Sequence, residues 1–223
     1  MSGLLGAIMP PWRMLGSVSN LLSGANGGFA PPLPHDPERD AAILAMLPMV
    51  PITGWTVQTL RDAAGPDADL LFPGGPAEMV EAHSELADRT MEQAGAAIAE
   101  TRVSKRVRAL LLLRLEQAEL DRDAVRRGLS LLSLPGNRGA AVRSLARTVD
   151  TIWHAAGDQS ADASWYSKRL LLAGVYSATL LYWLREGSGP ATEAFLDRRL
   201  ADVMRLGRLG KRRPLDTVRR PTP

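Results

Sequence analysis

The side chains best suited to acid–base or metal chemistry are histidines and the carboxylates near them. The chain has three histidines, His35, His83 and His154. His83 lies near Glu78, Glu81 and Glu85, but the Glu-x-x-His spacing that holds di-iron centres inside helical bundles is absent. We therefore interpret this stretch as a solvated acidic helix face and predict no metal site.

No other catalytic pattern stands out. The chain has no cysteine, which excludes disulfides, thiolate metal sites and cysteine nucleophiles. The sequence FPGGPAE (72–78) lacks the Lys-Ser/Thr of a phosphate-binding loop, and no serine stands in a nucleophile elbow. Asp158 follows His154 by four residues, a spacing that favours a local hydrogen bond over a catalytic pair. The sequence thus indicates neither an enzyme nor a cofactor.

The elements that must position any site are helices. Asp36 and Pro37 are the residue types of a helix N-cap and a first helical position. No segment shows the sustained two-residue alternation of strands. We predict an all-α domain over 35–206 with about nine helices, near 36–50, 54–65, 67–72, 76–98, 106–119, 122–132, 139–156, 162–184 and 192–204, and a turn at REGSGP (185–190).

The two ends differ in composition from this helical body. Residues 1–34 are rich in Gly, Pro, Ser and Asn and predict a flexible segment, with a weakly membrane-active stretch from Leu4 to Leu22 as the alternative. They lack the basic region of a secretory signal and make a poor mitochondrial presequence. Residues 207–223 hold six basic residues and one acid, a net of +5 against +3 for the whole chain, so residues 1–206 sum to −2. The basicity therefore belongs to a tail.

The run from Leu170 to Leu184 carries no charge and is apolar on all sides. Fifteen helical residues rise about 22 Å, short of the roughly 30 Å of a bilayer core. The pattern predicts a central helix enclosed by others. A ligand cavity lined by the same residues is the alternative.

Short helices followed by longer ones give the outline of a TetR-type regulator, and charge argues against its DNA-binding function. A helix-turn-helix would have to lie from about Trp55 to Phe72. That stretch has one arginine against three aspartates, whereas DNA binding needs cations against phosphates. We predict no nucleic-acid binding, and keep a TetR-type transcriptional regulator with a small apolar ligand as the alternative function.

Several motifs in the second half resemble the coenzyme Q (ubiquinone) biosynthesis protein nine family. They are LSLLSLPGN (129–137), VD with IWHAAGDQS (149–160), WYSKR (165–169) and FLDRR (195–199), with GWT (54–56) nearer the start. Close matching covers about 75 residues, with looser agreement from Asp40 onward. Trp-His-x-Ala-Gly-Asp-Gln-Ser followed closely by Trp-Tyr is a specific combination.

The resemblance implies a TetR-like fold that has lost DNA binding and serves as a non-catalytic accessory protein. Members of this family are lipid-binding and lie at the membrane surface. They bind aromatic isoprenoid precursors of ubiquinone and are thought to present them to the di-iron demethoxyubiquinone hydroxylase. The expected location is the bacterial cytoplasm beside the inner membrane, or the matrix side of the mitochondrial inner membrane in a eukaryote. The oligomeric state, monomer or homodimer, is left undecided by the sequence.

The resemblance also implies two sets of site residues. The lipid-binding candidates are Leu171, Leu172, Val175, Tyr176, Ala178 and Leu181. The partner-binding candidates for the hydroxylase are Asp150, Ile152, Trp153, Gly157, Asp158, Trp165, Tyr166 and Arg169. The structural alternative is that Trp153 and Trp165 simply pack helix ends together.

The C-terminus departs from the family pattern. Longer members carry an amphipathic membrane-docking helix beyond the equivalent of Gly207. Here RLGKRRPLDTVRRPTP is short, basic and interrupted by Pro214. We therefore expect attraction to an anionic membrane surface to come from the tail's charges.

Overall fold

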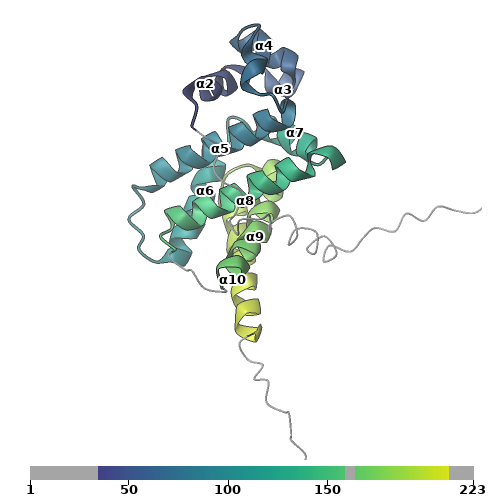
Figure 1. The fold of residues 1–223 in the computed structure, drawn as a ribbon. Coiled ribbons are helices and arrows are strands. Elements are labelled where there is room, and N and C mark those ends of the chain that lie inside the picture. The colour runs from purple at the N-terminus through teal and green to yellow at the C-terminus, as the bar shows by residue number, and fades with distance from the viewer. Residues whose placement is uncertain (1–34, 159–163, 211–223) are drawn as a thin grey trace, which may run out of the picture. The chain divides into compact units, whose positions relative to one another are not determined.

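The computed structural model describes residues 35–158 and 164–210 of the chain. Within these ranges the structure contains nine α-helices, two short 3₁₀ turns and no strand, which confirms the all-α prediction. Short helices precede long ones, in agreement with a TetR-like bundle. The predicted end segments 1–34 and 211–223 lie outside the described residues. The chain divides into two compact units, residues 1–159 and 160–223 (Figure 1), which we describe separately.

The first unit holds seven α-helices and both 3₁₀ turns. Its elements are α2 (Pro37–Met46), α3 (Val50–Thr53), α4 (Val57–Ala64), η1 (Ala68–Leu71), α5 (Pro76–Gly95), α6 (Val103–Gln117), α7 (Arg122–Leu132), η2 (Pro135–Asn137) and α8 (Arg138–Ala155). The predicted helix at 122–132 is confirmed to the residue, whereas α5 ends three residues earlier than expected and α6 begins three residues earlier.

The starts of the short helices follow their sequences. The Asp36 carboxylate accepts hydrogen bonds from the backbone N–H groups of Glu38 (2.9 Å) and Arg39 (3.4 Å), so it caps α2 as predicted. Thr56 caps α4 by accepting from the Thr59 N–H at 3.0 Å. Gly65 ends α4 with φ of 107°, a conformation that favours glycine.

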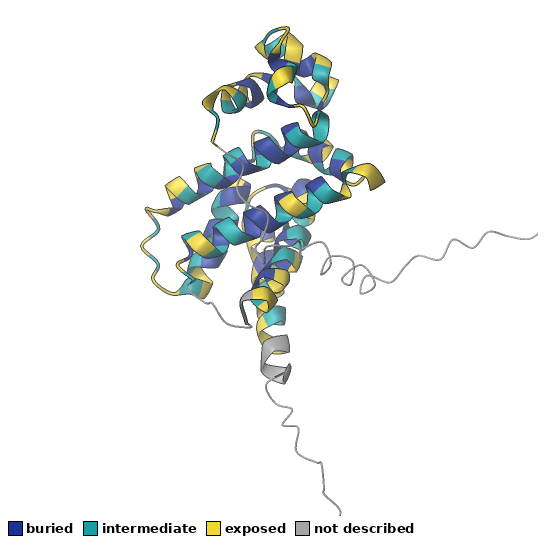
Figure 2. Ribbon diagram, viewed as in Figure 1, coloured by how far each residue is buried: buried dark blue, intermediate teal, exposed yellow. Residues whose placement is uncertain are grey.

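The core of the first unit is built around α5, which contacts α2, α6, α7 and α8. Met79 and Met91 of α5 are fully buried, and the short helices contribute buried Ile43, Met46 and Leu60. Figure 2 shows that buried residues occur along the length of α5. A helix with one face in solvent would instead show a continuous exposed stripe. Many side chains of α5 are buried because the helix lies among four others.

The second unit is a helical hairpin of α9 (Ser164–Glu186) and α10 (Pro190–Gly210). Gly187 and Gly189 both adopt positive φ in the connection, which confirms the predicted turn. The rings of Tyr182 and Phe195 stack across the two helices with centroids 4.3 Å apart. Thr192 Oγ1 donates to the Gly187 carbonyl at 2.7 Å, which ties the start of α10 to the turn.

Gly128 of α7 provides a test of the close packing on α5. A Cβ at this position would lie 3.0 Å from Val80 Cγ1 and 3.4 Å from Trp55 Nε1, which itself donates to the Ala124 carbonyl. We expect Gly128→Ala to lower the free energy of unfolding, because overpacking costs about 1–3 kcal/mol and the helix propensity of alanine returns only about 1 kcal/mol. Urea denaturation should show this loss, while Gly136→Ala, with no atom within 4 Å of its added Cβ, should change stability little. Equal effects would contradict the packing argument.

Candidate functional site

Helix α9 has one buried and one exposed apolar face. The buried residues recur at spacings of three and four and are Arg169, Leu172, Tyr176, Thr179 and Trp183, with Val175 beside them. The exposed residues are Tyr166, Leu170, Leu171, Gly174 and Leu181. The expectation of a helix enclosed on all sides is therefore wrong, because composition alone does not show which apolar face a neighbour covers.

The six lipid-binding candidates divide between these faces. Leu172, Val175 and Tyr176 are each at most 6% exposed, whereas Leu171 is 38% and Leu181 65% exposed. Ala178 is intermediate. The structure does not bring the six to a single surface. Leu171, Ala178 and Leu181 follow one another at helical spacing on the less buried side of α9, which we call the apolar stripe together with Leu170 and Gly174.

The end of α8 holds five of the partner-binding candidates, and several have a structural task. The N–H of Asp158 donates to the Trp153 carbonyl (3.1 Å) and the N–H of Gly157 to that of His154 (2.9 Å). This pair of bonds, with Gly157 at φ of 81°, is a Schellman C-cap. Ile152 is fully buried, while Asp150 and Trp153 are half-buried.

The remaining partner-binding candidates lie on α9. Tyr166 is 51% exposed, whereas Arg169 is buried. Trp165 belongs to the helix, but its side chain lies outside the described residues. Tyr166 is therefore the α9 aromatic that the structure places in solvent.

His154 has a different neighbour from the one suggested by sequence spacing. Its Nε2 lies 3.8 Å from Glu92 Oε1 on α5, and its side chain is largely exposed. The sequence had suggested Asp158, which instead uses its backbone N–H to end α8. A catalytic role for His154 gains no support from this arrangement.

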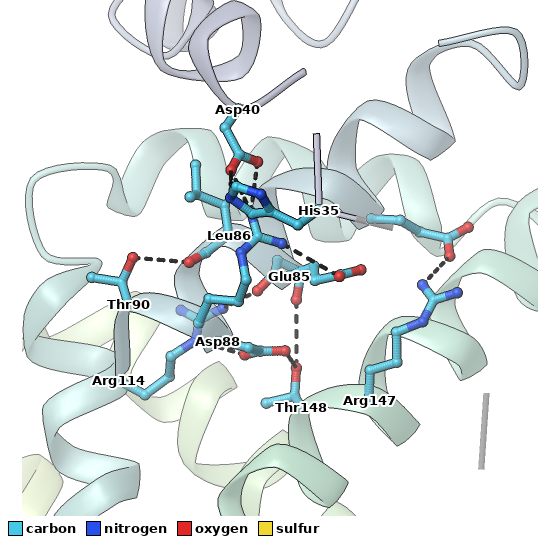
Figure 3. A network of polar contacts seen from close by, with 12 residues as sticks. His35, Asp40, Glu85, Leu86, Asp88, Thr90, Arg114, Arg147 and Thr148 are labelled. Atoms are coloured by element: carbon cyan, nitrogen blue, oxygen red, sulfur yellow. Dashed lines mark hydrogen bonds and ion pairs between the residues drawn. The ribbon is translucent and has the colours of Figure 1, made fainter. Parts of the chain in front are cut away.

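Three acidic residues of α5 are buried, which corrects the interpretation of Glu78 to Glu85 as an exposed acidic face. Glu81, His83 and Glu85 are buried, as is Asp88. The spacing of Glu81, Glu85 and Asp88 places them along one side of the helix. Figure 3 shows Glu85 and Asp88 within a network that reaches neighbouring helices.

Buried ion pairs join α5 to α6 and α8. Arg114 Nε donates to Asp88 Oδ1 at 2.9 Å, and Thr148 Oγ1 donates to Asp88 Oδ2 at 2.7 Å (Figure 3). Glu81 accepts from Arg147 Nη1 at 2.9 Å and from Arg143 Nη2 at 2.5 Å. Each carboxylate thus has two partners, which offsets the cost of its burial.

A second group of ion pairs joins α5 to α2. Arg89 Nη2 donates to both carboxylate oxygens of Asp40 at 2.6 Å, and its Nη1 approaches Glu85 Oε1 at 3.3 Å. Arg39 Nη2 donates to Glu78 Oε1 at 2.8 Å. The acidic side of α5 therefore contacts three helices through arginines.

His83 is buried without being charged. Its ring lies 5.4 Å from the Trp55 ring. Burial, together with the nearby positive charge of Arg114, lowers the pKa of His83 to about 3. Burial also raises the pKa of Asp88, although Arg114 and Thr148 oppose that change. His83 is consequently neutral at physiological pH.

The stretch from Trp55 to Phe72 forms α4 and η1, where a regulator would need a DNA-reading helix. Its one basic residue, Arg61, donates to both oxygens of Asp69 (3.0 and 2.7 Å). The cation is therefore compensated locally, and the absence of DNA contact stays a prediction.

Two further properties concern all the residues that the structure describes. Among them no group of three or more His, Asp or Glu side chains is placed to hold a metal ion. None of their helices has both the length and the apolar character needed to cross a bilayer.

Sequence reasoning missed two arginines of α6, Arg106 and Arg114. Arg114 stands within the leucine run ALLLLRLE, where a cation flanked by leucines signals a buried partner. Arg106 donates to four backbone carbonyls, from Gly95, Ile98, Glu100 and Ala155. No side-chain pattern indicates such contacts, because backbone acceptors leave no signature in the sequence.

Residues 139–207 match the family described as COQ9. The mitochondrial ubiquinone biosynthesis protein COQ9 of Bos taurus is 32% identical over 190 residues, which are 76% of this chain and 58% of the bovine protein. The Homo sapiens protein of that name gives the same identity and coverage. That of Schizosaccharomyces pombe is 31% identical over 147 residues, 62% of this chain and 57% of the yeast protein. The chain thus spans less than two thirds of these relatives.

The buried His83 leads to a prediction about acid stability. Because its folded pKa lies below the ordinary value of 6.5, the unfolded state takes up a proton first as pH falls. Stability should therefore drop by about 1.4 kcal/mol per pH unit between about pH 6 and 4 from this group. His83→Gln should flatten the pH dependence of the unfolding free energy in that window. A difference curve between the two proteins isolates the effect, and parallel curves would contradict it.

Proposed function

Because the chain belongs to the COQ9 family, whose named members act in ubiquinone biosynthesis, we propose that it is a non-catalytic lipid-binding accessory protein of that pathway. In this proposal it binds aromatic isoprenoid intermediates and presents them to the demethoxyubiquinone hydroxylase. The alignment with the vertebrate relatives covers only part of their length, so the ligand and the partner, which the family resemblance implies, are proposals for this chain.

The observation that carries the proposal is the apolar stripe of α9. Leu170, Leu171 and Leu181 are exposed along a helix that lies within the family match. Burying apolar area is favourable by about 25 cal/mol per Å², and a polyprenyl chain offers only apolar surface. An elongated hydrocarbon ligand suits a stripe that runs along a helix.

The buried carboxylates of the first unit favour a structural role over catalysis. The buried carboxylates Glu81 and Asp88 are each held by two partners, so they are engaged in joining helices. Trp153 and Tyr166 offer aromatic surface of the kind that anchors protein interfaces. We assign the hydroxylase contact to the end of α8, and keep Tyr166 of α9 as a separate candidate that is tested by itself.

Attachment to a membrane would be peripheral. The basic tail from Lys211 lies outside the described residues, and its attraction to anionic lipid stays a prediction. Basic residues near such a surface contribute about 1 kcal/mol each. A bacterial inner membrane and the mitochondrial inner membrane are both compatible with this form of attachment.

Leu181→Asn tests the apolar stripe. The substitution removes an exposed apolar side chain, so we expect the amount of co-purified isoprenoid to fall about tenfold, equivalent to about 1.4 kcal/mol of binding. Mass spectrometry of organic extracts from the purified protein measures this directly. Its melting temperature should change little, because Leu181 is 65% exposed.

Arg198→Gln on the exposed side of α10 is the matched control and should leave lipid recovery unchanged. Full lipid recovery from Leu181→Asn would assign binding to the opposite face of α9. A wild-type extract free of isoprenoids, combined with sequence-specific DNA binding, would instead support the regulator.

Tyr166→Ala tests the partner surface. Truncating an exposed interface anchor should weaken binding to the hydroxylase by roughly 2 kcal/mol, while the melting temperature stays within a few degrees. Titration calorimetry with purified hydroxylase gives the affinity. Unchanged affinity would remove Tyr166 from the interface, and a large loss of stability would make it a packing residue.

A further inference from the structure

The end of α8 has a complete set of hydrogen bonds for its last four carbonyls. Those of Ile152, Trp153 and His154 accept from the N–H groups of Ala156, Asp158 and Gly157. The fourth carbonyl, of Ala155, accepts from Arg106 Nε at 2.8 Å. Helices usually leave such groups to water or to caps, so a side chain from another helix is a specific arrangement.

The same guanidinium also holds the end of α5. Arg106 Nη2 donates to the Gly95 carbonyl at 3.2 Å, and Nη1 donates to that of Ile98 at 2.8 Å. Gly95 and Ala155 are the last residues of α5 and α8. One planar cation therefore joins two helix C-termini, where the helix dipoles favour positive charge.

We propose that Arg106 is a positioning residue for the partner surface at the end of α8. It fixes the direction in which the chain leaves the helix at Gly157 and Asp158, and with it the presentation of Trp153. This inference rests on the proposed function, since it concerns the surface assigned to the hydroxylase. Arg106 contacts carbonyls and acts through the backbone that it holds.

The guanidinium shape matters as much as its charge. Nε reaches the Ala155 carbonyl, Nη2 that of Gly95, and Nη1 those of Ile98 and, at 3.5 Å, Glu100. A lysine ammonium cannot reproduce this planar fork. Neighbouring Lys105 is exposed and pairs with Glu100 at 3.8 Å. It is therefore a cation of α6 that does not hold a helix end, and it serves as a control.

The test compares Arg106→Met and Arg106→Lys with Lys105→Gln and Gly128→Ala in the full chain. We expect both Arg106 variants to weaken hydroxylase binding about tenfold and to speed amide exchange at residues 156–158 by a similar factor. Lys105→Gln should alter neither property. Gly128→Ala, destabilised at the contact of α7 with α5, should keep hydroxylase affinity and so separates positioning from loss of stability.

Different failures have different meanings. Faster exchange at 156–158 with unchanged affinity would overturn the positioning role while leaving the proposed function in place. Equal loss of affinity in Gly128→Ala would also overturn it, because general stability would then explain the effect. No binding by the wild-type protein would reject the proposed partner itself. If Arg106→Met does not fold, Arg106→Lys provides the same comparison.

Discussion

The buried ion pair between Asp88 and Arg114 is the interaction on which the arrangement of the first unit depends. Removing one member of such a pair typically costs about 3–5 kcal/mol, whereas an apolar replacement of both can be neutral. The Asp88–Arg114 pair therefore contributes to how the helices are oriented rather than to net stability. Asp88 also accepts from Thr148, so the carboxylate fixes α5 against α6 and α8 together. Rotating α5 by one residue would leave buried charges without partners.

The other acidic residues of α5 extend this constraint to the N-terminal helices. Glu78 binds Arg39 of α2, and Arg89 binds Asp40 of the same helix. Packing of apolar side chains tolerates small changes in helix rotation, but directional pairs do not. The short helix α2 is in this way aligned on α5 by charge as well as by burial. A fold shared with DNA-binding regulators thus keeps its first helices in place although their basic residues are few.

Local rules in the sequence predicted the elements well and their surroundings less well. Asp36, Pro37 and Gly65 act through neighbouring residues, so capping rules located the start of α2 and the end of α4, whereas the predicted helix over 36–50 is divided into α2 and α3. The environment of His83 could not be predicted in this way, because its burial depends on helices distant in sequence. The same holds for α9. Its uncharged run signals low polarity on every side, yet only the folded chain shows that Leu181 is exposed while Trp183 is buried.

The closed hydrogen-bond set at the end of α8 has a consequence for evolution. The last carbonyls of α8 all have hydrogen-bond donors among residues before 159, one of them Arg106 of α6. The helix therefore does not rely on the chain that follows to stay folded. Insertions or deletions placed after Asp158 would therefore leave α8 intact. Lineages could alter the length of this junction and so adapt the second unit to different partners, with Gly157 as the residue least free to vary because of its φ of 81°.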